Sequence, residues 1–164
     1  NDADEQLENI DEWREIYKSV HFCPAEQNGY VNQEKLERWI KKYILILQKN
    51  GQEKLLSKTL GRLFVFSPTG EDGHYPCEPI REMIEKYGDN ELSRAFQQEV
   101  YYSRNFYTPS AGKKELKISE GYVENAQYLD KEYPKTARIF YELSEWYKMD
   151  ASMQRIEAET DFKE

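Results

Sequence analysis

The sequence predicts an all-α protein, a single domain of about seven helices packed around a long C-terminal helix. Two observations support this fold class. Apolar residues recur every three or four positions through most of the chain, which is the spacing of one helix face. Gly, Pro, Asn and Asp interrupt these stretches as turn signals, whereas the β-prone run "LFVF" at 63–66 only continues a helical stripe. A chain of 164 residues suits one domain covering positions 1–164.

The first expected helix lies near residues 3–19. Leu7, Ile10 and Tyr17 follow helical spacing there. The stretch "HFCPAEQNGYVN" at 21–32 then breaks the pattern, because it contains a Pro and an Asn-Gly pair, which are both turn signals. We therefore expect an irregular connection between the first helix and the second.

Asn32 predicts the start of the second helix, since Asn is a favoured N-cap residue. Gly51 predicts its end, because Gly readily takes the left-handed conformation that closes helices. A third helix is expected near 52–66. The apolar stripe of the second helix is wide and consists of Leu36, Trp39, Ile40, Tyr43, Ile44 and Leu47.

Four further helices complete the predicted order. The fourth is expected near 78–87, and Asp89 can cap the fifth. A polar loop follows at 108–112. Ser119 is expected to open the sixth helix, and Pro134 begins the seventh, where its missing N–H has no helical partner in any case.

The seventh helix carries apolar residues on more than one face, which indicates that several neighbours pack against it. This pattern makes it the expected centre of the domain. One face contains Ala137, Phe140, Tyr141, Ser144, Tyr147 and Ala151, and another contains Ile139, Leu143, Trp146 and Met153.

The net charge of −8 is confined to the two ends of the chain. Residues 1–20 contribute −5 and residues 150–164 contribute −3, whereas residues 21–149 hold nineteen charges of each sign. We interpret the acidic ends as solvated helix faces. Because the sequence contains no basic stripe to contact phosphates, no nucleic-acid partner is expected.

The sequence also lacks the features of a membrane or secreted protein. The longest apolar run, "YILIL" at 43–47, is far shorter than the roughly 20 residues of a membrane span. No signal peptide is visible, and two Cys suit a reducing cytoplasm better than a disulfide framework. The first residue is Asn, so we expect the chain to be part of, or excised from, a longer protein.

Three stretches resemble the C-terminal helical domain of large uncharacterised bacterial proteins. "YPKTARIFYELSEWYKMDA" at 133–151 is similar to an aromatic-Pro-x-Thr-Ala-Arg run that opens a long helix there. "NGYVNQEKLERWI" and "GEDGHYPCEPIREMIE" resemble turns that lead into helices. The resemblance covers most of residues 28–150 and implies a helical domain with no assigned activity. It implies no functional residues.

Both histidines and both cysteines of the chain form two short pairs, His21-x-Cys23 and His74-x-x-Cys77. Two such pairs could supply a Cys₂His₂ zinc site. A Cys–His dyad made from the same residues could instead support thiol catalysis, if a thiol pKa were lowered. The alternative is that both Cys are small buried residues and both His lie on loops. We prefer this alternative, because a domain of this size needs no metal to fold.

The loop "GEDGHYPCEP" at 70–79 has its own explanation as turn chemistry. Asp72-Gly73 is expected to make the turn. Tyr75 is expected to anchor the loop, with its ring buried and its hydroxyl at the rim. Pro76 and Pro79 bracket the start of the next helix.

The function that we predict is therefore a non-catalytic helical interaction or scaffold module of a larger cytoplasmic bacterial protein. Its partner would be another protein or other domains of the same chain, without nucleic acid, membrane or cofactor. The alternative is a metal-dependent enzyme, with zinc as the metal, or a thiol enzyme; either would use His21, Cys23, His74 and Cys77.

Overall fold

In the computed structural model the described residues are 21–103 and 110–161, and their fold is all-α, as predicted. Two strands of two residues, β1 (Glu26–Gln27) and β2 (Tyr30–Val31), pair in an antiparallel manner ahead of the helices. The helix expected near residues 3–19 lies outside the described residues. The described helices are α2 (Gln33–Lys49), α3 (Leu55–Phe64), α4 (Glu78–Tyr87), α5 (Asn90–Tyr102), α6 (Lys113–Leu129) and α7 (Pro134–Asp161).

The helix caps predicted at Asn32, Gly51 and Asp89 are confirmed. The Asn32 side chain accepts a hydrogen bond from the backbone N–H of Lys35 at 2.9 Å, and the Asp89 side chain accepts one from Leu92 at 2.8 Å. Gly51 follows α2 with φ of +62°, the left-handed conformation expected of a helix-closing glycine. The Asn32 and Asp89 side chains satisfy backbone N–H groups that have no partner inside their helices.

The predicted start of α6 at Ser119 is wrong, because the helix begins at Lys113. Gly112 precedes it with φ of +80° and lies so close to α7 that an added Cβ would clash with the Ala151 carbonyl oxygen. Ser119 is buried in the middle of α6, where its hydroxyl donates to the carbonyl of Ser144 at 2.9 Å. The residue expected to cap the helix therefore joins α6 to α7.

The strands are a second departure from the sequence prediction, which expected only an irregular break. Asn28 and Gly29 both have positive φ, of 54° and 82°. Two consecutive residues with positive φ form the tight turn that matches the twist of a hairpin, and Asn-Gly favours it strongly. The Glu26 carboxylate accepts a hydrogen bond from the Gly29 N–H at 2.6 Å, which supports the turn.

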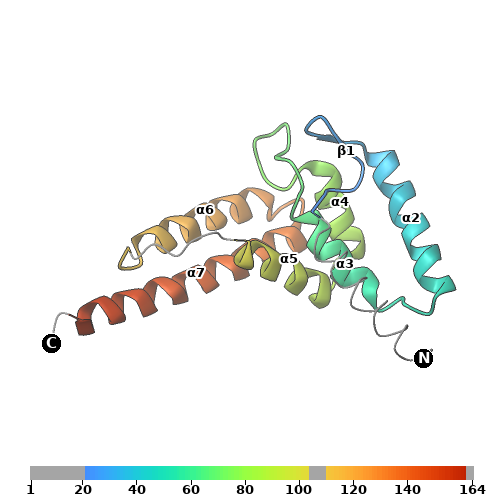
Figure 1. Ribbon diagram of the computed structural model, residues 1–164. Coiled ribbons are helices and arrows are strands. Elements are labelled where there is room, and N and C mark those ends of the chain that lie inside the picture. The colour runs from blue at the N-terminus through green and yellow to red at the C-terminus, as the bar shows by residue number, and fades with distance from the viewer. Residues whose placement is uncertain (1–20, 104–109, 162–164) are drawn as a thin grey trace, which may run out of the picture.

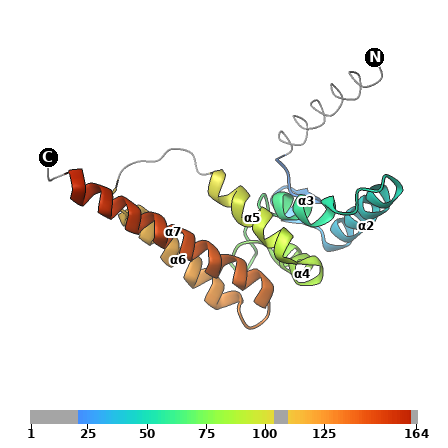
Figure 2. The same cartoon turned by 90° about the horizontal axis from the view of Figure 1, so that it is seen from below.

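The helices form a packed body with one long arm (Figures 1 and 2). Helices α6 and α7 lie side by side along the arm, α3 packs on α5, and the first half of α7 contacts α4 and α5. In both views, α2 and the C-terminal end of α7 lie at opposite ends of the molecule.

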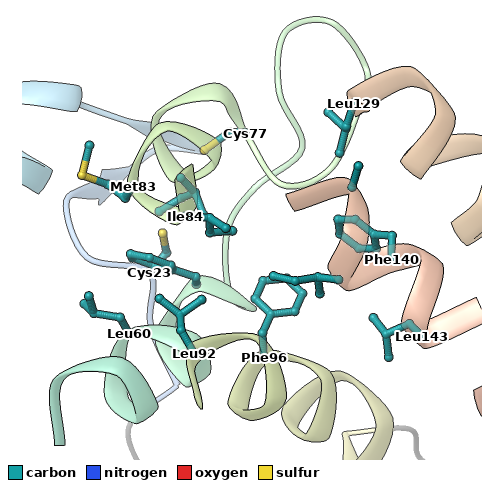
Figure 3. Close-up of a cluster of buried hydrophobic side chains, with 14 of the residues drawn as sticks. Cys23, Leu60, Cys77, Met83, Ile84, Leu92, Phe96, Leu129, Phe140 and Leu143 are labelled. Carbon is teal, nitrogen blue, oxygen red and sulfur yellow. The ribbon is translucent and has the colours of Figure 1, made fainter. Parts of the chain in front are cut away.

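Buried aromatic and aliphatic side chains join the first half of α7 to the other helices (Figure 3). The rings of Phe96 on α5 and Phe140 on α7 meet edge to face with centroids 5.9 Å apart. Ile139 and Leu143 are fully buried beside them, so more than one face of this half of α7 is covered, as predicted.

The second half of α7 is different, and the expectation that Met153 packs inward is wrong. Ala151 and Gln154 are buried against the start of α6, but Met153 is 59% exposed. In the described part of the chain, α6 is the main neighbour of this half of α7, and Tyr101 of α5 reaches it with a hydrogen bond to Asp150 at 2.6 Å. The apolar pattern of the sequence continues past the point where neighbours surround the helix.

Leu143→Ala is expected to lower the free energy of unfolding by about 2 to 5 kcal/mol, the range for removing a fully buried Leu side chain. Met153→Ala is the matched control on the same helix and should change it by less than about 0.5 kcal/mol. Urea unfolding followed by circular dichroism measures both. Equal effects of the two substitutions would contradict the division of α7 into a surrounded half and a half with one open side.

Candidate functional site

The loop between α3 and α4 is held by a turn at Asp72 and Gly73, as the sequence predicts. Gly73 has φ of +79°, and the Asp72 carboxylate accepts a hydrogen bond from the His74 N–H at 2.9 Å. Gly70 donates to the carbonyl of His74 at 2.8 Å and so closes the loop on itself. The loop is therefore fixed by its own backbone and by one carboxylate.

Arg81 on α4 binds this loop from inside the protein. Its side chain is 1% exposed, and its guanidinium donates to both carboxylate oxygens of Asp72, at 2.6 and 3.0 Å. It also donates to the backbone carbonyls of Pro76 at 2.5 Å and His74 at 2.7 Å. The hydrogen bonds from Arg81 hold the pKa of Asp72 well below its usual range. Sequence reasoning missed this ion pair, because Asp72 was explained by the turn alone.

Tyr75 anchors the loop, but its hydroxyl does not lie at the rim as expected. The hydroxyl donates to the backbone carbonyl of Val65 at 2.6 Å, and the ring packs near Phe96 and Phe140. Burial raises the pKa of Tyr75 above its ordinary value. The Tyr75–Pro76 peptide bond is cis, and Pro79 lies in the first turn of α4.

The structure gives the two histidines different neighbours. The ring of His21 meets Phe66 edge to face at 5.2 Å. The ring of His74 stacks on Tyr128 of α6 at 3.5 Å, and its Nδ1 lies 3.3 Å from the side-chain oxygen of Asn125. Across residues 21–103 and 110–161, no three His, Cys, Asp or Glu side chains lie where they could share a metal ion.

The two cysteines, unlike the histidines, enter one hydrophobic cluster as unpaired thiols (Figure 3). Burial raises the pKa of Cys23 to about 12 and also raises the pKa of Cys77. Cys77 directly precedes α4, and its sulfur lies 3.2 Å from the hydroxyl of Ser67. A raised pKa keeps a thiol protonated at neutral pH, which weighs against either residue as a nucleophile.

A groove of about 450 Å³ lies between the hairpin turn and the loop of residues 69–71, next to the start of α4. Its charged lining residues are Glu71 and Glu78, and no Lys, Arg or His is among the residues that line it. Gly70 approaches the Glu78 carboxylate so closely that an added Cβ would be 2.8 Å from its oxygens. An acidic, open groove of this kind is unsuited to phosphate or other anions.

Three exposed apolar residues form a row on α7, and acidic residues lie at both of its ends. We call it the acidic α7 stripe and define it as Glu145, Met149, Met153, Ile156 and Glu157, all of them exposed. Its three apolar members are 65%, 59% and 59% exposed. The stripe repeats at three and four residues, so its members share one helix face. The sequence prediction placed Met153 in the core and therefore did not identify this stripe. Glu145 and Glu157, each four residues from a Met of the row, were the signal that this face meets solvent.

Comparison with known proteins gives no family for this chain: no family model, no curated protein and no solved structure matches it. The resemblance to uncharacterised bacterial domains therefore stays a prediction. In the part of the chain that the structure describes, no helix is both long and apolar enough to cross a bilayer.

Asp72→Asn should lower the free energy of unfolding at pH 7 by about 3 kcal/mol. This is the lower end of the range for breaking a buried ion pair, and we choose it because the Asp72 side chain is 23% exposed. Glu71→Gln, which removes the same charge from the neighbouring exposed position, is the control and should have little effect. Chemical unfolding of the three proteins gives the comparison.

The same substitution should also change how stability depends on pH. The pKa of Asp72 is lowered by folding, so its contribution is complete above the unfolded value of about 3.9 and is lost as pH falls toward the folded value. The difference in stability between the parent protein and Asp72→Asn should be constant from pH 7 to 5 and shrink below about pH 4. A difference that grows on acidification would contradict this assignment.

Proposed function

We propose that this protein is a non-catalytic helical interaction module of a larger cytoplasmic bacterial protein, and that it binds its partner through the acidic α7 stripe. The observation that carries the proposal is the exposure of Met149, Met153 and Ile156 in one row on the outer half of α7. An amphipathic helix that presents apolar residues at i, i+4 and i+7 is the form in which helices insert into grooves of other proteins.

The chemistry of the stripe suits protein binding. Met is unbranched and polarizable, so Met149 and Met153 can adapt to a partner surface without strain. Exposed apolar rows bordered by charged residues are typical of interaction sites. Glu145, which also pairs with Lys148 at 2.6 Å, and Glu157 border this row, and their carboxylates favour a partner whose surface is basic.

The buried groups favour binding over catalysis. Cys23 and Cys77 have raised pKa values, and the histidines pack on separate aromatic rings. The Asp72–Arg81 pair has its hydrogen bonds within the loop and α4, where it stabilises the fold. The proposal therefore includes no cofactor and no catalytic residue.

The compartment and the excluded partners rest on the sequence. Two unpaired cysteines suit a reducing cytoplasm. The net charge of −8 opposes association with phosphate backbones and anionic lipids, so neither nucleic acid nor membrane is part of the proposal.

Replacing the residue at 153 with a photo-crosslinking amino acid should test the stripe in cells of the source organism. Irradiation should give discrete protein adducts from position 153, because the stripe faces the partner. The same crosslinker at Arg155, an exposed position on a different face of α7, is the control and should give none. Equal adduct patterns from both positions, or none from 153, would reject the proposal.

The variant Met149→Gln/Met153→Gln/Ile156→Gln separates binding from folding. The purified protein should keep its melting temperature within about 2 °C, because exposed side chains contribute little to stability. A much larger drop would show that the stripe packs within its own chain.

A further inference from the structure

Helix α2 carries a surface that is complementary to the acidic α7 stripe. We call it the basic α2 face and define it as Arg38, Lys41, Lys42, Leu45, Ile46 and Lys49, all of them exposed. Their spacing of three and four residues places them on one side of the helix. Leu36, Ile40 and Leu47 are buried on the opposite side. Leu45 and Ile46 are 64% and 57% exposed, so this face has an apolar centre inside a basic border.

The charges of this face are not neutralised by the described part of the protein. Helix α2 has five basic and two acidic residues, a balance of +3 in a chain whose net charge is −8. None of the ion pairs formed between described residues includes a side chain of α2. A basic helix with exposed aliphatic residues therefore remains open to an acidic partner.

The acidic α7 stripe matches this face in length and in charge. From Arg38 to Lys49 the helix rises roughly 16 Å, and from Glu145 to Glu157 roughly 18 Å, at about 1.5 Å per residue. The last turn of α7 contains no basic residue, although a helix C-terminus carries a partial negative charge. Glu145 already pairs with Lys148 at 2.6 Å, but Glu157 takes part in none of the ion pairs between described residues. A basic partner would compensate Glu157 and the helix end.

The distance between the two surfaces within one chain means that they would have to meet surfaces of other copies. Helix α2 and the outer end of α7 lie at opposite ends of the molecule in both views (Figures 1 and 2). The two surfaces of one chain are therefore placed to meet those of neighbouring copies. A contact between two different surfaces repeats from copy to copy and gives open chains or rings instead of closed dimers.

We propose that the acidic α7 stripe of one copy docks on the basic α2 face of a second copy, so that the protein associates head to tail. This inference rests on the proposed function and names its partner. Met149, Met153 and Ile156 would pack against Leu45 and Ile46, with carboxylates and ammonium groups along both sides. A contact between two single helices is small, so association is reversible and depends on concentration and salt.

Charge reversal on each surface gives the test. Variant A is Lys41→Glu/Lys42→Glu, and variant B is Glu145→Lys/Glu157→Lys. Sedimentation velocity of the full chain is measured from 10 μM to 500 μM in low salt and again in 0.5 M NaCl. The parent protein should sediment faster as its concentration rises in low salt, whereas each variant alone should remain monomeric.

An equimolar mixture of A and B should associate again. The α7 stripe of A meets the unchanged α2 face of B, and the reversed stripe of B meets the reversed face of A. The control Lys117→Glu/Lys131→Glu makes the same charge change at exposed positions of α6 and the following turn, and it should behave like the parent. Circular dichroism melts of every variant verify folding.

A parent protein that stays monomeric at 500 μM, or a mixture that stays monomeric, would overturn the proposal. A fluorescent DNA duplex is titrated in parallel; salt-sensitive binding that variant A loses, without self-association, would assign the basic α2 face to nucleic acid instead. If the parent is monomeric but position 153 still crosslinks to another protein, the interaction module stands and only self-association fails. If both experiments are negative, both proposals fail.

Discussion

The buried guanidinium of Arg81 is the interaction on which the loop between α3 and α4 depends. Removing a cation from water is costly unless its N–H groups find partners, and Arg81 is 1% exposed. Asp72 supplies the counter-charge, and the backbone carbonyls of His74 and Pro76 accept the other hydrogen bonds that Arg81 donates. The ring of Tyr133, just before α7, lies 5.5 Å from the guanidinium carbon. One side chain thus connects a turn, the start of α4 and the start of α7.

The closed loop in turn places Tyr75 over the helices that form the core. Its hydroxyl is bound by Val65 at the end of α3, and its ring approaches Phe96 of α5 and Phe140 of α7. The Asn125 side chain on α6 donates to the Tyr75 carbonyl at 2.6 Å. Side chains from three helices and the backbone carbonyl that follows α3 therefore converge on one residue of the loop. These contacts hold the loop against the packed body, from which the paired helices α6 and α7 extend.

The fold class, most helix bounds and the caps at Asn32 and Asp89 could be predicted from sequence, because local spacing and capping chemistry determine them. The Asp72–Arg81 pair could not, since the residues are nine positions apart and only the closed loop brings them together. The predicted start of α6 at Ser119 was wrong for a related reason. A serine hydroxyl can cap a helix, but it can also donate a hydrogen bond to the backbone of a neighbouring helix, as Ser119 does. Met153 was misplaced because periodicity reports which residues share a face, but not whether another element covers it.

The difference in length between α6 and α7 leaves the last turns of α7 beyond the end of the neighbouring helix. Helix α6 has 17 residues and α7 has 28, and Gly112 at the start of α6 meets Ala151 and Gln154. The last turns of α7 therefore extend past the start of the helix beside them. Short helices without packing partners are marginal in water, and acidic residues at a helix C-terminus weaken them further. An extension with these properties gains most from a basic surface, and such a surface is present on α2. The same chain therefore supplies both an acidic helix end and the basic face that we propose covers it in another copy.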